Sequence, residues 1–487
     1  MTLQVESLEA TTYNVLKVIP SLRNLLQPVN RLPPETLSHI VQHVPHEKAR
    51  DTRSIIPLTH VCRYWRRSIV STPGNWTFIS SRNKDVAALS LQRAKAAPLQ
   101  INLDMDQVRK NPGFSDLIAP YIRNTETLHV CCLLTTKELM QTLPNFPRST
   151  PNLRSLSLFP ELRDAEWDLF TDHRFGPLIP TLTHLSLMNI PLYPAFLHLK
   201  TLTDLTLRYL RFNLHLDAFL DFLEGNRSLE RATLDIQFTQ PSLRHLRHRV
   251  AIRNRLRNLS IYSANETDNN PLISNIALQR GAHLEITLYD MTKGLDEVLS
   301  YIYAARLSNL ESPTFMEYHP EESRILLHGP NGSFSFETLV SLECPFSDSP
   351  ILPLTNVRVF RIRRTLKSDP FARPIAFPPS SFPALETFGV ESEVTVSHLF
   401  SALFSNPSSC PSLKTLAFLD CHVDDGFMEE LTRFSSNRKR TTSARLHRVV
   451  IVDSKGILPR FASIDALGKH VPIVDARIGK ELPADLM

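Results

Sequence analysis

A chain of 487 residues exceeds the size, about 250 to 300 residues, at which one hydrophobic core usually stops growing, so we expect more than one structural unit. Hydrophobic residues make up 42% and charged residues 21% of the chain, a composition that excludes widespread disorder. The net charge of +5 is far below the concentrated basic surface of a dedicated nucleic-acid-binding protein, so nucleic acid is not expected as a partner.

The first 27 residues and the cysteines bear on the cellular compartment. We predict an N-terminal helical extension over residues 1–27, with Glu6 and Glu9 where a secretory signal would be basic. No apolar run approaches the roughly 18 residues that cross a bilayer. The six cysteines are scattered and include no CxxC pair, as expected for reduced thiols. These features predict a cytoplasmic or nuclear protein, or one found in both, that makes no membrane contact.

Amphipathic helices are predicted in the segment that follows. Pro33 and Pro34 suit a helix start, because a missing N–H costs nothing in the first turn. The apolar side chains of this first helix then recur at steps of three and four, at Leu37, Ile40, Val41 and Val44. A second apolar stripe with the same steps follows at Leu58, Val61, Cys62, Trp65 and Ile69 and ends near Thr72-Pro73-Gly74.

Two helices of this size carry more large apolar side chains than they can bury against each other. The surplus must pack either on the rest of this chain or on a partner protein, and the periodicity leaves both alternatives open. The residue identities favour the partner. Leu32-Pro33-Pro34-Glu35-x-Leu37-x-x-Ile40, then Leu58-x-x-Val61-Cys62-x-x-Trp65-Arg66 and a trailing Pro73-x-x-Trp76, closely resemble the F-box. Within that family the segment is most similar to the F-box proteins of mushroom-forming fungi, in which a solenoid usually follows.

The resemblance implies a three-helix segment that inserts its apolar face into a Skp-family adaptor, which in turn binds a cullin-RING ligase. The link from His46 to Arg53 is longer than in compact F-boxes, which affects the loop between the helices and not the matched positions. By position, the resemblance implies adaptor-contact or core roles for Leu32, Pro33, Glu35, Leu37, Ile40, Leu58, Val61 and Trp65.

Downstream, the phrase L-x-x-L-x-L recurs, which is the sequence signature of leucine-rich repeats. Its alternating part predicts a short strand with one face inward, and each unit exposes an apolar face until the next unit stacks on it. Weaker copies occur at Leu229, Leu339 and Val357, and Leu284 to Leu288 alternates as a strand does. The clear copies are Leu153-Leu156-Leu158, Leu182-Leu185-Leu187, Leu202-Leu205-Leu207, Leu256-Leu259-Ile261, Leu385-Phe388-Val390, Leu413-Leu416-Phe418 and Leu446-Val449-Ile451.

The predicted fold class is therefore α/β, with an N-terminal three-helix F-box over residues 28–80 and an irregular leucine-rich-repeat solenoid over residues 81–454. Short parallel strands alternate with helices such as Leu216 to Leu223 and Val394 to Phe404, and residues 455–487 form a C-terminal cap or tail. An ordinary α/β domain is the alternative. The Asn or Cys that normally follows the last leucine of a repeat is matched only by Cys421, so we expect the coil to be irregular.

The chain carries no catalytic or nucleotide-binding motif: it lacks G-x-S-x-G, the P-loop, H-E-x-x-H and G-x-G-x-x-G. We therefore expect no enzymatic activity, no cofactor and no metal site. Cys421-His422 with Asp424 and Asp425 could suggest a metal ligand set or a nucleophile. Neighbouring side chains of a strand point to opposite faces, however, and a turn position in the repeat explains Cys421 better.

Two basic segments are candidate docking sites. Leu243 to Leu259 is rich in arginine, which suits an acidic or phosphorylated partner, although a solvated helix on the convex side is the favoured alternative. Arg438-Lys439-Arg440 fits either a nuclear signal or an exposed loop, and three charges favour the loop. The candidate substrate-docking residues in the first segment are Arg247, Arg249, Arg253, Arg255 and Arg257.

These observations favour a non-catalytic substrate-recognition adaptor of an SCF-type cullin-RING ubiquitin ligase, whose repeats bind a protein target that the sequence does not identify. The alternative is an interaction scaffold that uses the F-box without ubiquitin transfer. A third class, an enzyme on an α/β scaffold, is disfavoured by the missing motifs.

Overall fold

The chain forms two compact units, Met1–Leu202 and Thr203–Met487, in the computed structural model. No helix in the described part of the chain combines the length and the apolar composition needed to cross a membrane. The structure describes residues 12–13, 19, 23, 26–42, 55–133, 136–143, 146, 148, 150–160, 179–188, 190, 196, 199–212, 216–238, 250–251, 255–263, 272, 276–288, 312–319, 323–338, 354–363, 379–391, 400, 403–406, 408–421, 423–441, 445–453 and 459–478.

The first unit begins with short helices. They are η1 (Pro28–Arg31), α2 (Pro34–Gln42), α3 (Ile55–Leu58), α4 (Arg63–Ser71) and η3 (Pro73–Trp76). The second apolar stripe was expected to form one helix, but it is divided between α3 and α4. Cys62 lies in extended backbone between them and accepts a hydrogen bond from the Trp65 N–H, so it caps a new helix.

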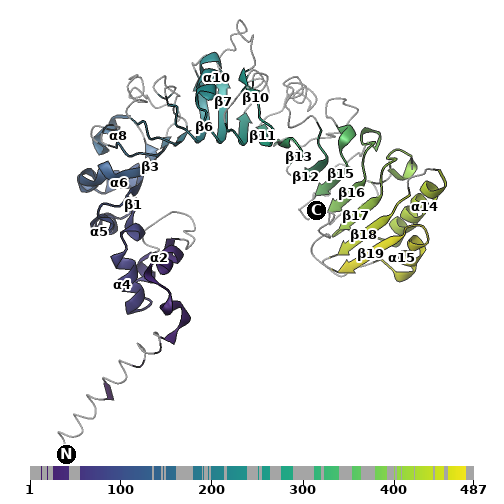
Figure 1. Ribbon diagram of the computed structural model, residues 1–487, viewed down its shortest axis with the longest axis horizontal. Helices are drawn as coiled ribbons and strands as arrows, with labels where there is room; N and C mark the ends of the chain where they lie inside the picture. Colours follow the sequence, from purple (N-terminus) through teal and green to yellow (C-terminus); the bar gives the residue numbers. More distant parts are fainter. Residues whose placement is uncertain are drawn as a thin grey trace, which may run out of the picture. The chain divides into compact units, whose positions relative to one another are not determined.

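A parallel sheet follows in the first unit, and its strands pair in chain order. Helices lie on one face of this sheet, where they contact the first three strands (Figure 1). The strands are β1 (Phe78–Ser80), β2 (Leu99–Asp104), β3 (Thr125–Leu133), β4 (Ser155–Pro160) and β5 (His184–Met188). The helices are α5 (Lys84–Ala94), α6 (Met105–Lys110), α7 (Phe114–Ile118), η4 (Ala119–Asn124) and α8 (Thr136–Thr142).

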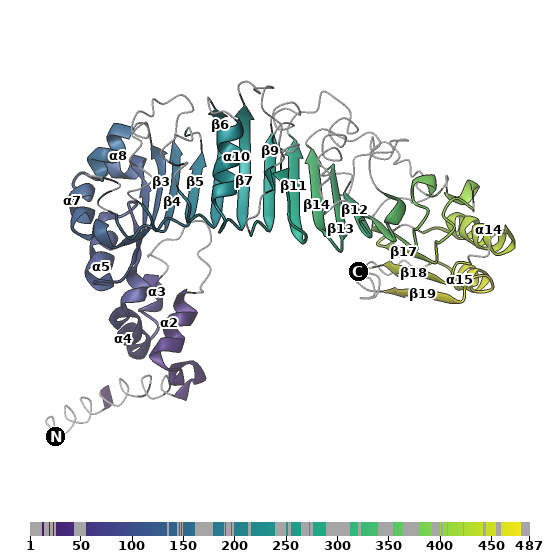
Figure 2. The ribbon, with the colours of Figure 1, turned by 45° about the horizontal axis from the view of Figure 1, so that its top comes forward.

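The second unit continues the strand-after-strand pattern, with neighbouring strands side by side in Figure 2. Its strands pair in the order β6, β7, β9, β11, β14, β13, β12, β15, β16, β17, β18, β19. They span Asp204–Phe212, Arg231–Phe238, Asn258–Ser263, Ala282–Leu288, Gly332–Thr338, Arg324–Gly329, Phe315–His319, Val359–Arg363, Thr387–Glu391, Thr415–Leu419, Arg448–Asp453 and Ile473–Ile478. The other elements are α10 (Leu216–Gly225), β8 (Val250–Ala251), β10 (Ile276–Ala277), η8 (Leu354–Asn356), η9 (Pro379–Ser381), α14 (Asp425–Thr441) and α15 (Phe461–Gly468).

The predicted all-parallel arrangement is wrong at one place. Strand β13 is antiparallel to both β12 and β14, while β11 pairs β14 and β12 pairs β15 in parallel. The turn between β13 and β14 lies between Gly329 and Gly332, which are paired, and Gly332 has a φ of 133° that side-chain-bearing residues rarely adopt. A Cβ on Gly329 would also lie 2.7 Å from the Ser312 carbonyl oxygen. Glycine thus permits a tight hairpin here, which inserts two strands between repeats without breaking the sheet.

The seven clear leucine-rich repeats predicted from the sequence are confirmed as structural units. In each, the first residue precedes a strand and the other two lie within it, and all their side chains are at most 3% exposed. The inward apolar residues of neighbouring strands are in register, as with Leu156 opposite Leu185 and Leu416 opposite Val449. Stacking therefore buries one leucine layer per repeat.

The predicted helix over Leu216 to Leu223 is α10, and Phe400 and Leu403 to Ser405 are helical within the predicted segment from Val394 to Phe404. Of the weaker repeat copies, Leu229 and Val357 are fully buried before their strands. Leu339 lies outside the described residues.

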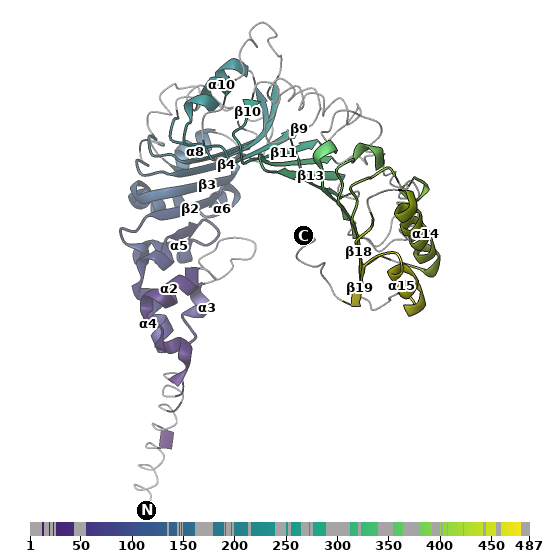
Figure 3. The ribbon, with the colours of Figure 1, turned by 45° about the vertical axis from the view of Figure 1, so that its right-hand side comes forward.

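The C-terminal repeats are held by α14 and α15, which contact each other and cover one side of β18 and β19 (Figure 3). Arg438 lies in the last turn of α14 and is 0% exposed, so the loop predicted for Arg438-Lys439-Arg440 is wrong. Its Nη2 donates hydrogen bonds to the carbonyl oxygens of Cys410 at 2.5 Å, Leu413 at 3.1 Å and Pro411 at 3.2 Å. Burial lowers the Arg438 pKa. Arg438 thus supplies the donors that cap the turn before β17.

Replacing Leu205 in β6 with Asp should place an unpaired charge at a site that is 1% exposed. We expect the repeats around β6 to unfold, with a loss well above the ~1 kcal/mol of an average substitution. Far-UV circular dichroism and limited proteolysis measure this. Thr206→Asp, one residue later on the more exposed face, is the matched control, and equal effects of the two changes would contradict the register.

Replacing Arg438 with Ala should leave three turn carbonyls without their donor, at a cost of about 3 kcal/mol. Backbone amides of β17 and α14 should then exchange with solvent about 100-fold faster, as hydrogen–deuterium exchange mass spectrometry would show. The neighbouring Arg440→Ala removes an exposed arginine and should change exchange little. Similar exchange in the two variants would show that Arg438 does not hold the turn.

Candidate functional site

The helical segment at the start of the first unit has a small core of its own. Leu37 and Val41 of α2 and Ile69 of α4 are at most 1% exposed. Trp76 is also fully buried, and its Nε1 donates a 2.9 Å hydrogen bond to the Ile69 carbonyl oxygen. The side chains that join α2 to α4 are therefore buried inside the segment and cannot contact a partner.

Asparagine side chains fix the ends of these helices. Asn75 is 4% exposed, and its Oδ1 accepts a 2.9 Å hydrogen bond from the Ser38 hydroxyl. Asn30 Oδ1 accepts a 2.8 Å hydrogen bond from Trp65 Nε1. The Tyr64 hydroxyl donates to the Leu32 carbonyl oxygen. These bonds hold η1 and the start of α2 against α4, so the segment presents its remaining side chains from a fixed backbone.

Large apolar side chains remain exposed on this segment. Among the residues that the structure describes, nine large hydrophobic side chains are exposed, and six of them precede residue 62. We call four of these the N-terminal apolar surface: Leu26, Val29, Ile40 and Val61, with exposures of 68%, 40%, 42% and 54%. The exposed large apolar side chains that the structure describes are thus concentrated toward the start of the chain.

The eight residues predicted for adaptor contact divide into three groups. Leu37 is buried and belongs to the core. Leu32, Leu58 and Trp65 are half-buried, and the Asn30 bond holds the Trp65 ring. The exposed group, which is open to a partner, consists of Pro33, Glu35, Ile40 and Val61.

The predicted arginine docking patch is only partly described. Arg255 and Arg257 are exposed just before β9, whereas Arg247, Arg249 and Arg253 lie outside the described residues. The favoured alternative, a helix over this segment, is wrong at Val250–Ala251, which pair with Ile276–Ala277 in a short parallel ladder. The described part of the patch thus offers two exposed guanidinium groups.

A charged network occupies the strand face of β12, β15 and β16. Glu317 is 8% exposed and binds His319 Nε2 at 2.6 Å, with guanidinium nitrogens of Arg361 at 3.8 Å and Arg363 at 3.9 Å. The hydrogen bond from His319 is the main cause that lowers the Glu317 pKa. Arg363 also pairs with Glu391 at 3.3 Å. Because each arginine has a carboxylate close by, this network is better suited to holding strands together than to binding an acidic ligand.

The favoured interpretation of Cys421 agrees with its contacts. Its thiol donates to the Val390 carbonyl oxygen at 3.3 Å, one repeat earlier, and to that of Leu419 at 3.4 Å. This is the turn role that the repeat assigns to a cysteine at that position. The Asp424 carboxylate caps a helix: its Oδ1 accepts a 2.7 Å hydrogen bond from the Phe427 N–H near the start of α14.

One cluster corresponds to no motif of the sequence: Asp104, Cys131 and Cys132, whose ligand-type atoms lie within 4.8 Å of one another. The available signal was that Asp104 ends β2 and that Cys131 lies two residues before the end of the neighbouring strand β3. Asn30 and Asn75 were missed as well, because an asparagine that bonds across helices has no periodic signature.

No protein-family model matches the chain, and no curated protein matches it. Among solved structures, the chain is similar to a TLR13–ssRNA13 complex, with 14% identity, a TM-score of 0.33 and coverage of 83% of this chain. The chain spans about half of that protein, 52% of its length. It is also similar to an internalin, InlF, from Listeria monocytogenes, with 10% identity, a TM-score of 0.22, and coverage of 92% of this chain and 97% of the internalin. These scores are too low to carry an argument about function.

Proposed function

We propose that this chain is the substrate-recognition adaptor of an SCF-type cullin-RING ubiquitin ligase. The N-terminal apolar surface docks a Skp-family adaptor, and the leucine-rich repeats hold the protein target. The chain itself contributes proximity, and the ligase subunits contribute the chemistry.

The observation that carries this proposal is the exposure of Ile40 and Val61. Both occupy positions matched to the F-box, and both remain open to solvent although they belong to apolar stripes. Burying half-exposed side chains of this kind against a partner gains about 25 cal/mol per Å² of apolar area. An apolar surface on a rigid helical segment therefore has a physical reason to bind another protein.

The repeats support the second half of the proposal. Their inward side chains are buried by stacking of neighbouring repeats. The side chains on the exposed face of the strands can therefore differ without disturbing the fold. Extended strand faces of this kind serve as binding surfaces in solenoid proteins. The identity of the target is set by those exposed side chains.

The double substitution Ile40→Asp with Val61→Asp should abolish adaptor binding. Each change puts a charge into an apolar interface, and losing two anchors of about 2 kcal/mol each lowers affinity by at least about 100-fold. Isothermal titration calorimetry with a purified Skp-family adaptor measures it. Both side chains are exposed in the free chain, so its circular dichroism spectrum should not change.

The matched control is Ile473→Asp with Ile478→Asp on β19, where the two side chains are 53% and 66% exposed. This pair makes the same chemical change on the last strand and should leave adaptor affinity intact. Undiminished binding of the adaptor by the N-terminal double variant would show that this segment is not an F-box.

Ubiquitin transfer separates a ligase adaptor from a scaffold. When the full chain is combined with adaptor, cullin, RING subunit and charging enzymes, we expect ubiquitin on the chain itself or on captured protein, detected by immunoblot. The Ile40→Asp/Val61→Asp variant should support none, while the β19 variant should behave as the parent does. Assembly of the complete complex without any transfer would place the protein in the scaffold class.

A further inference from the structure

A cluster of two thiols and a carboxylate lies at the ends of β2 and β3. Asp104 and Cys131 are direct partners in the parallel ladder of these strands. In β2, Leu99, Ile101 and Leu103 are buried, so Asp104 belongs to the alternate set of side chains on the opposite face. Cys131 shares that face through its pairing with Asp104.

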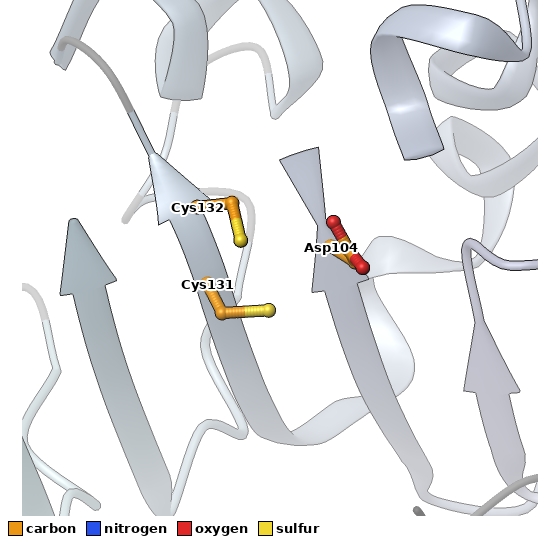
Figure 4. Close-up of side chains that lie close together, drawn as sticks. All are labelled: Asp104, Cys131 and Cys132. Carbon is orange, nitrogen blue, oxygen red and sulfur yellow. The ribbon is translucent and has the colours of Figure 1, made fainter. Parts of the chain in front are cut away.

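Adjacent residues of a regular strand point to opposite faces, and Cys131 and Cys132 escape this rule. The register of β3 with β4 shifts between Cys131 and Leu133, and Cys132 has a φ of 55°. A left-handed non-glycine residue in a bulge is a local backbone strain. It brings both sulfurs to the side of Asp104, as Figure 4 shows. Arg109 Nη1 donates to the Cys132 carbonyl oxygen at 3.5 Å and thereby supports the bulge.

One oxygen of the Asp104 carboxylate is buried, and the backbone of this residue is held in place. Ser81 fixes its backbone on both sides: the Asp104 N–H donates to the Ser81 hydroxyl at 2.8 Å, and that hydroxyl lies 3.1 Å from the Asp104 carbonyl oxygen. The side-chain Oδ1 is buried and has no hydrogen-bond partner among the residues that the structure describes. A buried carboxylate oxygen without a donor is costly, and a cation would offset that cost.

We propose that Asp104, Cys131 and Cys132 bind a zinc-class divalent cation through two thiolates and one carboxylate oxygen. The three ligand atoms lie within 4.8 Å of one another, so one ion between them could reach all three, and a tetrahedral zinc site has ligand bonds of about 2.0 to 2.3 Å. Thiolates select zinc over the oxygen-seeking calcium and magnesium ions. Three protein ligands leave a fourth position for water.

The site is distinct from the N-terminal apolar surface, so it does not depend on the proposed function. Metal binding also gives a physical reason for the bulge, because the left-handed Cys132 lies where the register of β3 shifts and both sulfurs come to the side of Asp104.

The test uses the full chain, reduced, stripped with a chelator and titrated with Co²⁺ and then Zn²⁺. We expect one Co²⁺ per chain, with thiolate-to-cobalt charge-transfer absorption and the visible bands of tetrahedral cobalt, both displaced by Zn²⁺. Cys131→Ser with Cys132→Ser should eliminate the charge-transfer band and weaken Zn²⁺ binding by at least about 100-fold. Asp104→Asn, which keeps the side-chain shape, should keep the band and weaken binding by at least about tenfold.

Cys62→Ser is the matched control, since it changes a half-buried thiol on the same unit and should leave both readouts unchanged. Circular dichroism of each variant checks its fold, and Asp104→Asn remains informative if the double cysteine variant is unstable. Reduced parent protein without the charge-transfer band, or a double cysteine variant with parental Zn²⁺ affinity, would overturn the proposal. So would a Cys131–Cys132 disulfide in peptide maps together with absent metal binding, which would make the pair a redox element instead.

Discussion

The structure depends on one constraint: the inward side chains of each repeat strand can be buried only by the neighbouring repeat. Leu156, Leu185 and Leu416 are each at most 2% exposed because aligned residues of adjoining strands cover them. A single repeat has no second layer of its own, so stability comes from the interfaces between repeats. The same constraint gives the two faces of each strand different roles. The face that carries the leucines is buried by the neighbouring repeats, and the opposite face can make other contacts, such as those of the Glu317 network.

The repeats could be predicted from the sequence because their signal is periodic. The direction of each strand could not be predicted from that signal. The phrase L-x-x-L-x-L fixes a turn followed by an inward-facing strand, and it placed β4, β5 and β18 correctly. The hairpin of β13 and β14 shows the same alternation as a parallel strand, because alternation records burial and carries no direction. Arg438 was misplaced for a related reason. Three consecutive charges suggest solvent, yet one guanidinium reaches buried turn carbonyls in place of the missing asparagine ladder.

The N-terminal segment shows the limit of apolar periodicity for a site. Steps of three and four continue from Leu58 through Val61 to Trp65, although the backbone breaks between α3 and α4. A cysteine cap is rare compared with serine or aspartate, so Cys62 gave no helix-start signal. Periodicity also identifies a stripe without telling which members are covered: Leu37 is buried while Ile40, three residues later, is open. That difference is set by tertiary packing, and it separates the core of the segment from its contact surface.

Both candidate sites lie where a local rule is broken. Ile40 and Val61 break the rule that large apolar side chains of a stripe are buried, and Cys132 breaks the rule that neighbouring strand residues face apart. Sequences that specify one fold agree with local rules at most positions, and departures concentrate where side chains serve something other than folding. The apolar side chains that define the seven repeats obey the burial rule, because each is at most 3% exposed. Exposed apolar area and backbone strain each have a free-energy cost in the isolated chain, and a bound protein surface or a bound cation would offset that cost.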